Sequence, residues 1–316
     1  MEFFQGKDVI SLAGIQRDDM ESLFNQARKM EPFVQLRSRI DLLKDKVLGV
    51  AFFQVSTRTR ISFESAMVRL GGGVVGFSDP KTTRAGDYYS ESLHDVIRMM
   101  ESYSDVIVMR HPQDGAPAEA AGYASVPIIS GGDGYNEHPT QSLLDVYTIQ
   151  QEKGTVDGLN IALVGDMNMR VMHSLPIALS QYDSTVHFVS PEEKKMPEKW
   201  LKQFADAGLH YEEHDSLDDL MPDLDVIYLM ATLTPSYAKG RTETNVEHLT
   251  TPKAYRIDAE KLSRAKSDMI VLHPLPRTNE LPTEVDELVQ ARYFEQAHHG
   301  VALRMALLSQ MMGRSI

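Results

Sequence analysis

Short apolar runs alternate along this chain with segments of helical periodicity, and this alternation limits the fold more than any other feature. Runs that are apolar at nearly every position are typical of parallel strands, because helices cover both faces of a parallel sheet. The predicted fold class is therefore α/β, with parallel sheets. The candidate strands are VLGVAFF (47–53), GVVGF (73–77), DVIVMR (105–110), VPIIS (126–130), NIALVG (160–165), VHFVS (186–190), LHYEE (209–213), DVIYLM (225–230) and MIVLHP (269–274).

Amphipathic segments between these runs predict the covering helices. A division of the chain falls in or near the helix that begins at Pro139, since one set of strands precedes it and a second set follows. The last helix, residues 300–313, has no strand after it and could pack on either half; its Met and Leu stripe predicts a core face. The candidate helices are SFESAMVRL, ESLHDVIRMMESY, PTQSLLDVYTIQQ, VMHSLPIALSQ, PEKWLKQFADAG, SLDDLM and GVALRMALLSQMMG.

The composition argues against several classes of function. A net charge of −13 over 316 residues disfavours general binding to nucleic acid, so an anionic ligand would need clustered arginines. The chain has no cysteine, which excludes a disulfide framework and a cysteine-ligated metal and fits a reducing cytoplasm. We recognise no secretion signal and no stretch long enough for a bilayer, so no membrane partner is expected. Neither a metal nor a cofactor is predicted.

The segment FFQVSTRTRISFE follows the first candidate strand and precedes a helix expected to begin near Ser62. In open parallel sheets, ligands bind beyond the carboxyl ends of strands, where helix N-termini favour anions. Ser56, Thr57 and Thr59 add hydroxyl donors, and Arg58 adds a guanidinium that can bind two oxygens at once. The pattern predicts an oxyanion site without the glycines of a P-loop. From these residues alone, helix capping and solvated arginines remain an alternative.

Polar residues also follow three other candidate strands. Arg110 ends DVIVMR, and SGGDGYNEHPTQ places His138 and Gln141 at a helix start after VPIIS. HPLPR (273–277) follows MIVL, and its two prolines stiffen a loop whose carbonyls suit an NH₂ group. No GxSxG elbow, metal cluster or evident carboxylate base accompanies them. The set suits a reaction driven by positioning and by stabilisation of a tetrahedral intermediate.

Together these motifs resemble the aspartate carbamoyltransferase family, within the aspartate/ornithine carbamoyltransferases. FFQVSTRTRISFE, VMRHPQDGA, NEHPTQSLLD, the GD…R…HS stretch and VLHPLPR occur in this order over nearly the whole chain. The resemblance implies carbamoyl transfer from carbamoyl phosphate to L-aspartate, in de novo pyrimidine biosynthesis, without a cofactor. It implies two doubly wound parallel-sheet domains joined by helices: residues 1–139 plus 297–316 for carbamoyl phosphate, and residues 140–296 for aspartate. It also implies a homotrimer with active sites at subunit interfaces, and leaves a larger assembly open.

The resemblance also implies a role for individual residues. Arg58, Thr59 and His138 would polarise the carbamoyl carbonyl and, with Arg110, are the implied catalytic residues. Arg170, in GDMNMR, would bind a carboxylate of aspartate. The departing phosphate can accept the proton of the attacking amine. The implied carbamoyl phosphate ligands are Ser56, Thr57, Arg58, Thr59, Arg110, His138, Gln141 and the backbone of Pro274 and Leu275.

The chain departs from the family pattern in the loop expected to reach the neighbouring subunit. The family has a lysine there, whereas this chain has Tyr89 in TTRAGDYYSESLHD. Arg84 or Lys81 could supply the missing charge, although lysine and arginine are not equivalent. Gln54 also replaces an acidic residue before STRTR.

Further departures lie on the aspartate side. The stretch before Arg170 is one residue shorter than in the family, and Ala231 occupies the place of an arginine. Arg241 is the nearest candidate to replace that arginine, although it could equally be a solvated loop charge. Three interpretations follow: an aspartate carbamoyltransferase with a shifted loop, a transcarbamylase for a different amino acceptor, or a non-catalytic homologue that binds carbamoyl phosphate.

Overall fold

The structure, a computed structural model, describes residues 3–86, 90–232 and 250–316. The chain divides into two compact units, residues 1–144 with 298–316 (unit 1) and residues 145–297 (unit 2). Each unit is a parallel sheet between helices, which confirms the predicted α/β class. Helix α5 (Pro139–Lys153) begins at the predicted residue and crosses the division after Leu144.

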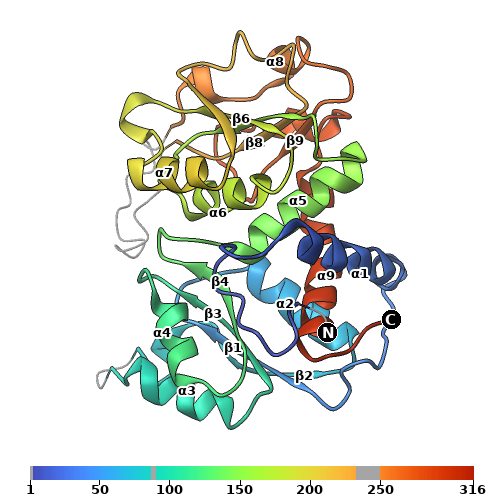
Figure 1. The fold of residues 1–316 in the computed structure, drawn as a ribbon, viewed down its shortest axis with the longest axis vertical. Helices are drawn as coiled ribbons and strands as arrows, with labels where there is room; N and C mark the ends of the chain where they lie inside the picture. The colour runs from blue at the N-terminus through green and yellow to red at the C-terminus, as the bar shows by residue number, and fades with distance from the viewer. Residues whose placement is uncertain (1–2, 87–89, 233–249) are drawn as a thin grey trace. The chain divides into compact units, whose positions relative to one another are not determined.

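Unit 1 contains a four-stranded parallel sheet in the order β2-β1-β3-β4. On one face, β1, β3 and β4 pack against α3 (Leu93–Glu101) and α4 (Ala116–Tyr123) through a buried cluster that includes Ile97, Met109 and Ala120. Figure 1 shows α2 (Arg58–Arg69) and α9 (Tyr293–Met311) on the other side of this sheet. The strands are β1 (Val47–Phe52), β2 (Gly73–Phe77), β3 (Val106–His111) and β4 (Ile128–Asp133).

The helices α2, α9 and α1 (Arg17–Gln35) contact one another within unit 1. The guanidinium of Arg304 on α9 lies 5.0 Å from the ring centre of Phe63 on α2. Gln310, one turn and a half further along α9, donates to the carbonyl of Ser22 on α1 at 3.4 Å. The Met and Leu stripe of α9 is buried, as expected of a core face.

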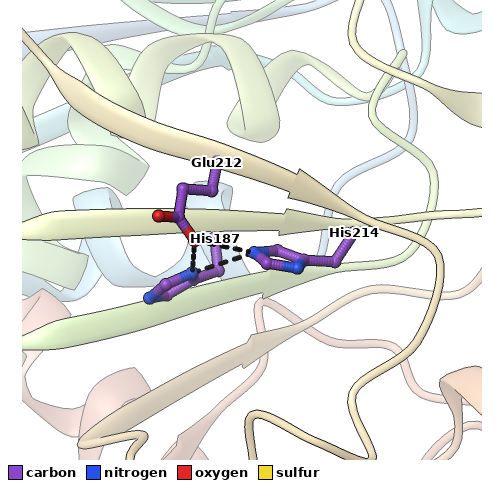
Figure 2. A group of neighbouring side chains, drawn as sticks. All are labelled: His187, Glu212 and His214. Atoms are coloured by element: carbon purple, nitrogen blue, oxygen red, sulfur yellow. Dashed lines mark hydrogen bonds and ion pairs between the residues drawn. The ribbon is translucent and has the colours of Figure 1, made fainter.

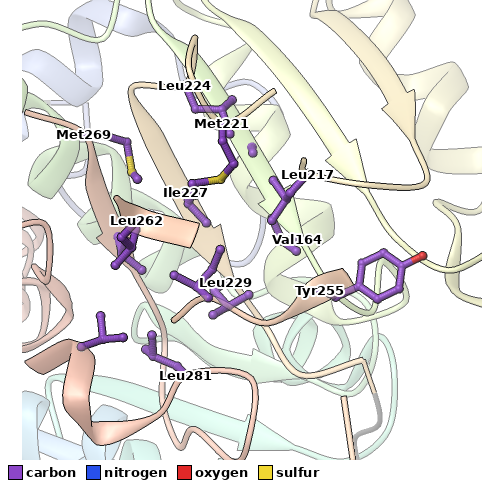
Figure 3. Close-up of a cluster of buried hydrophobic side chains, with 14 of the residues drawn as sticks. Val164, Leu217, Met221, Leu224, Ile227, Leu229, Tyr255, Leu262, Met269 and Leu281 are labelled. Atoms are coloured by element: carbon purple, nitrogen blue, oxygen red, sulfur yellow. The ribbon is translucent and has the colours of Figure 1, made fainter. Parts of the chain in front are cut away.

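Unit 2 contains a five-stranded parallel sheet in the order β7-β6-β5-β8-β9. One face packs on α7 (Glu198–Asp206), where the rings of Phe188 and Phe204 lie 5.9 Å apart. The other face carries the apolar cluster of Figure 3, in which Val164, Ile227 and Leu229 meet residues of the irregular segments. The strands are β5 (Asn160–Val164), β6 (Thr185–Val189), β7 (His210–His214), β8 (Val226–Leu229) and β9 (Ile270–Leu272).

In each sheet the strand order reverses at one point. In unit 1 the chain runs from β1 to β2 and then crosses to β3 on the other side of β1. In unit 2 it runs from β5 to β6 and β7, then crosses to β8 on the other side of β5. The connections that follow the two strands at such a switch point run in opposite directions and leave a crevice for a ligand beyond the carboxyl ends of the strands. The loops after β1, β3, β5 and β8 are therefore the ones placed to bind substrates.

Several local predictions were wrong. The segment SLDDLM forms turns instead of a helix: Leu217 and Met221 are buried in the sheet cluster, and Pro222 follows at once. Helices α1 and α4 had no counterpart among the candidates. The last helix begins at Tyr293, seven residues before the predicted Gly300. No helix in the described part of the chain has the length and apolar character needed to span a membrane.

Candidate functional site

The loop after β1 reaches its helix earlier than predicted. Helix α2 begins at Arg58 instead of near Ser62, with Thr57 as its N-cap and a first amide bond from Ile61 to Thr57 O at 3.0 Å. Ser62 lies inside the helix, where its hydroxyl donates to the carbonyl of Thr59 at 2.9 Å. Because the amides of the first turn of a helix have no acceptor within it, STRTR places these donors at the carboxyl end of β1.

The side chains of this segment divide by burial. Thr57 and Arg58 are exposed, whereas Thr59 is only 5% exposed and faces the protein interior. Arg60 pairs with Glu64 one turn along the helix at 3.2 Å, which gives it a structural role. Of the two arginines in STRTR, Arg58 is thus the one that extends toward solvent at the switch point.

Arg110, on β3, contacts both the loop after β1 and strand β4 in unit 1. Its Nε donates to Gln54 Oε1 at 3.1 Å, and its Nη1 lies 3.5 Å from both Ser56 Oγ and Gly131 O. The register between β3 and β4 shifts here, because Met109 pairs with Ser130 and His111 pairs with Asp133. One extra residue on β4 produces a bulge beside Arg110, a feature common next to functional sites.

The sequence did not predict the contact between Gln54 and Arg110. Gln54 was considered only as the loss of a carboxylate, but its amide oxygen accepts from Arg110. A neutral amide fixes the guanidinium without cancelling its charge, whereas a carboxylate would form an ion pair. Gln54 thus orients the guanidinium of Arg110 at the end of β3.

The SGGDGYNEHP segment carries His138 to the start of α5. Gly134 has φ +47°, and a Cβ there would lie 1.9 Å from Asp114 Oδ1, so the turn requires glycine. His138 is buried, and its Nε2 lies 3.4 Å from Thr59 Oγ1. Gln141 follows in the first turn of α5 and is half-buried. The structure therefore brings the predicted threonine and histidine into direct contact.

Glu137 anchors this loop from the side away from β1. Its carboxylate accepts from Ser11 Oγ at 2.6 Å and from the amide of Leu12 at 3.2 Å. Burial raises the pKa of Glu137, and the nearby charge of Asp133 adds to this, while the two hydrogen bonds act in the opposite direction. The N-terminal segment thus holds the backbone next to His138.

In unit 2, the loop that follows β5 leads into α6 (Arg170–Leu179), and Arg170 is the first residue of that helix. It is 4% exposed. The preceding loop is held by Asp166, which accepts from the amide of Asn168 at 3.1 Å and pairs with Lys194 at 3.0 Å. Gly165 has φ +129°, and a Cβ there would lie 2.1 Å from Met230 O at the end of β8. The loop before Arg170 thus starts at the switch point of unit 2.

The HPLPR loop of unit 2 is fixed by a buried histidine and glutamate. His273 Nδ1 accepts from the amide of Leu275 at 2.8 Å, so its other nitrogen carries the proton and donates to Glu280 Oε1 at 3.0 Å. Leu275 has φ +56° and precedes a cis bond to Pro276. The loop that carries the Pro274 and Leu275 carbonyls is therefore held in an uncommon backbone conformation by side chains behind it.

Burial alone raises the pKa of Glu280, but hydrogen bonds from His273 and from Thr278 outweigh it and lower the pKa to about 2. Glu280 is thus a buried carboxylate that stays ionised. The amide of His273 donates to Gln296 Oε1 at 2.9 Å, and Gln296 Nε2 donates to Asp145 Oδ1 at 2.6 Å. These buried supports of the loop lie far apart in the sequence, and the sequence pattern did not reveal them.

The remaining residues singled out in the sequence lie outside these clusters or outside the described residues. Arg277, the last residue of HPLPR, pairs with Asp286, so its charge serves the fold. Arg84 is exposed in the loop after β2, and Ala231 is buried after β8. Tyr89 and Arg241 lie outside the described residues.

Comparison with known proteins decides the family. Residues 7–151 match the family described as aspartate/ornithine carbamoyltransferase, carbamoyl-P binding domain, and residues 157–311 match its Asp/Orn binding domain. The chain belongs to the aspartate/ornithine carbamoyltransferase family. The carbamoyltransferase is 43% identical to the aspartate carbamoyltransferase catalytic subunit of Methanopyrus kandleri, over 99% of both chains. It is 42% identical to that of Thermoplasma acidophilum, over 98% of this chain and 99% of the other.

Solved structures of the same family resemble the carbamoyltransferase over nearly its whole length. Aspartate transcarbamoylase from Trypanosoma cruzi in complex with carbamoyl phosphate and aspartate matches with a TM-score of 0.85 and 36% identity, over 97% of both chains. The complex of that enzyme with N-(phosphonacetyl)-L-aspartic acid gives the same TM-score and identity, over 97% of this chain and 96% of the other. The predicted two-domain transcarbamylase fold is thereby confirmed.

Proposed function

We propose that this carbamoyltransferase transfers the carbamoyl group of carbamoyl phosphate to the amino group of L-aspartate, giving N-carbamoyl-L-aspartate and phosphate. The observation that carries this proposal lies at the switch point of unit 1. There Arg110 contacts Ser56 of the loop before α2, and His138 contacts Thr59 within α2. Cations, hydroxyls and helix amides are gathered at the carboxyl ends of the strands of one sheet. Such a set fits a ligand that contains both a phosphate and a carbonyl group.

Unit 1 would hold the donor. The exposed guanidinium of Arg58 and the amides of the first turn of α2 bind phosphate oxygens, and Ser56 and Thr57 add hydroxyls. Thr59 and His138, 3.4 Å apart, donate to the carbamoyl oxygen, on which negative charge grows in the tetrahedral intermediate. Arg110 and Gln141 complete the set of ligands.

Unit 2 would hold the acceptor and orient the donor. Arg170 binds a carboxylate of aspartate, and the carbonyls of Pro274 and Leu275 accept from the carbamoyl NH₂. The amine nitrogen attacks the carbamoyl carbon, the bond from carbon to the phosphate oxygen breaks, and the departing phosphate takes the amine proton. This route needs no side-chain base, in agreement with a predicted site set that contains no carboxylate.

Aspartate is favoured as acceptor because the relatives and the structures compared are named for it. The test is an assay for the ureido product with aspartate, ornithine and other amino acids as acceptors, together with calorimetric titration of carbamoyl phosphate. We expect product with aspartate alone. Product only with another amine would identify a different transcarbamylase. Heat on adding carbamoyl phosphate without product from any amine would identify a binding protein.

We also propose a homotrimer that acts in the cytoplasm in pyrimidine biosynthesis, with Arg84 or Tyr89 reaching the site of a neighbouring subunit. Exposed apolar side chains on and around α2 and on β2 support a subunit contact there: Val55, Ile61, Val68 and Val75. The lack of cysteine in the chain fits a reducing compartment.

A further inference from the structure

Two histidines and a glutamate meet at the edge of the unit 2 sheet. None of the three is assigned a role in carbamoyl transfer. His187 lies on β6, and Glu212 and His214 lie on the edge strand β7. His187 pairs in register with Glu212, and His214 is two residues further on, so all three project from the same face (Figure 2). This is the face opposite Phe188, which packs on α7.

One atom of each side chain makes all the contacts within this group: His187 Nδ1, Glu212 Oε2 and His214 Nε2. His187 Nδ1 and His214 Nε2 are 3.1 Å apart, and Glu212 Oε2 lies 3.5 Å from the first and 3.2 Å from the second. Bonds of about 2.0–2.1 Å from a tetrahedral zinc ion to its ligands place those ligands about 3.3 Å apart. The triangle formed by the three atoms therefore has the size of one face of such a tetrahedron.

Hydrogen bonds alone satisfy this triangle poorly. Its angles are near 60°, so one N–H can point at only one of its two neighbours, and the remaining lone pairs face each other. A cation at the centre would accept all three lone pairs at once. Imidazole nitrogen with carboxylate oxygen is a ligand set that zinc and related divalent ions prefer.

The surroundings also fit a metal ligand set. His187 is buried, and its Nε2 lies 3.5 Å from Asn160 Oδ1, an arrangement that directs Nδ1 toward the group. The Glu212 side chain is 61% exposed, so water can reach the group.

We propose that His187, Glu212 and His214 bind one divalent transition-metal ion of the zinc type, with water as the fourth ligand. The ion would join β7 to β6, its neighbour in the sheet. The lack of cysteine excluded only thiolate ligands, so the prediction of no metal from the sequence is revised for this site. The proposal is independent of the proposed reaction, since none of its three residues is assigned to it.

The test uses the full-length protein freed of metal by a chelator and titrated with Zn²⁺ against a chromogenic chelator, and with Co²⁺ by visible absorption. We expect one ion per chain and a Co²⁺ spectrum typical of tetrahedral coordination. Affinity should fall at least tenfold in Glu212→Gln and in His214→Gln. His210→Gln is the matched control, because His210 is exposed on the same strand and face but outside the triangle.

Thermal unfolding gives a second readout. Zn²⁺ should raise the Tm of the wild type and of His210→Gln by a few degrees and leave that of His214→Gln unchanged. Metal-free His214→Gln should retain the circular dichroism spectrum and the basal activity of the wild type. Should the wild type bind no ion in a saturable way, or should both triad variants bind as tightly as it does, the group is a hydrogen-bonded cluster only and the proposal is wrong.

Discussion

Single arginines in this protein have different roles that depend on what lies beside them. Arg60 pairs with Glu64, and Arg277 pairs with Asp286, so both charges stabilise the fold. Arg58 is exposed at the first position of α2, and Arg110 is held by the neutral amide of Gln54. Arg58 and Arg110 are the two arginines that we propose bind the donor at the switch point of unit 1.

Replacing Arg58 with alanine should reduce kcat/KM by at least about 10²–10³-fold, because a donor to the developing charge is lost. The melting temperature should change little, since the side chain is exposed. Steady-state kinetics and thermal unfolding measure the two effects. Arg60→Ala is the control and should keep most of the activity. Activity near that of the wild type in Arg58→Ala would remove the proposed phosphate site.

Arg241→Ala tests the aspartate side at a residue outside the described part of the chain. If Arg241 replaces the arginine that Ala231 lacks, the KM for aspartate should rise about tenfold or more, because a charge-assisted contact is lost. The KM for carbamoyl phosphate should remain nearly constant. Initial rates with each substrate varied in turn measure both. Lys239→Ala is the control, and an unchanged KM for aspartate in Arg241→Ala would assign that carboxylate to another residue.

Among the elements, the HPLPR loop is supported by residues distant in sequence, such as Gln296 and Asp145. Its first residue, His273, donates from its ring to Glu280. The amide of His273, just after β9, donates to Gln296, which in turn donates to Asp145. Leu275 has φ +56°, which is costly for a residue other than glycine, so we expect these contacts to hold the loop in its shape. Glu280 is therefore a positioning residue for the carbonyls of Pro274 and Leu275.

Glu280→Gln should lower kcat/KM by roughly 10–100-fold through a small displacement of the loop. It should also destabilise the fold at pH 7. The folded pKa of Glu280, about 2, lies below its usual 4.5, so its ionisation contributes roughly 3 kcal/mol. That contribution is complete above about pH 4.5 and is lost as the pH falls toward 2.

Denaturant unfolding at pH 7 and at pH 3 measures the contribution of ionised Glu280 to the free energy of unfolding. The difference between the wild type and Glu280→Gln should be large at pH 7 and should fall by more than half at pH 3. Glu284→Gln, at an exposed position in the same region, is the control and should change stability little at either pH. A difference that stays the same at both pH values would mean that the ionised form of Glu280 does not stabilise the fold.

At the scale of the whole molecule, each unit has its own sheet and its own switch point, and α5 and α9 run from one unit into the other. The proposed donor residues follow strands of unit 1, and the proposed acceptor residue follows a strand of unit 2. The exposed Arg84 and the apolar side chains around α2 support a further level, the proposed trimer.

Mixing chains tests shared sites. If Arg84 acts in the site of a neighbouring subunit, Arg58→Ala and Arg84→Ala should each be nearly inactive alone. Refolding an equal mixture should restore activity, because about a quarter of the sites in random trimers receive both wild-type residues. Sedimentation should show trimers throughout. Full activity in Arg84→Ala alone, or no recovery in the mixture, would exclude Arg84 from a shared site.

Particular residues show how far the sequence could predict this protein. Apolar runs located the strands within a few residues, and STRTR, HPTQ and HPLPR located the loops at the strand ends. The start of α2 at Arg58 was not predicted, because β-region and helical conformations are both open to Ser and Thr near a helix end. Glu280 and Gln54 were missed as supports, because their partners lie elsewhere in the chain or had been assigned other roles.

The sequence by itself determined the α/β class, the positions of the strands and the residue types at their carboxyl ends. It could do so because burial on both faces of a parallel sheet imposes a local pattern of apolar residues. The tertiary structure alone decided the strand order, the switch points, the tautomer of His273 and the meeting of His187 with Glu212 and His214. These features depend on which strands become neighbours, and residues brought together in that way leave no periodic signal along the chain.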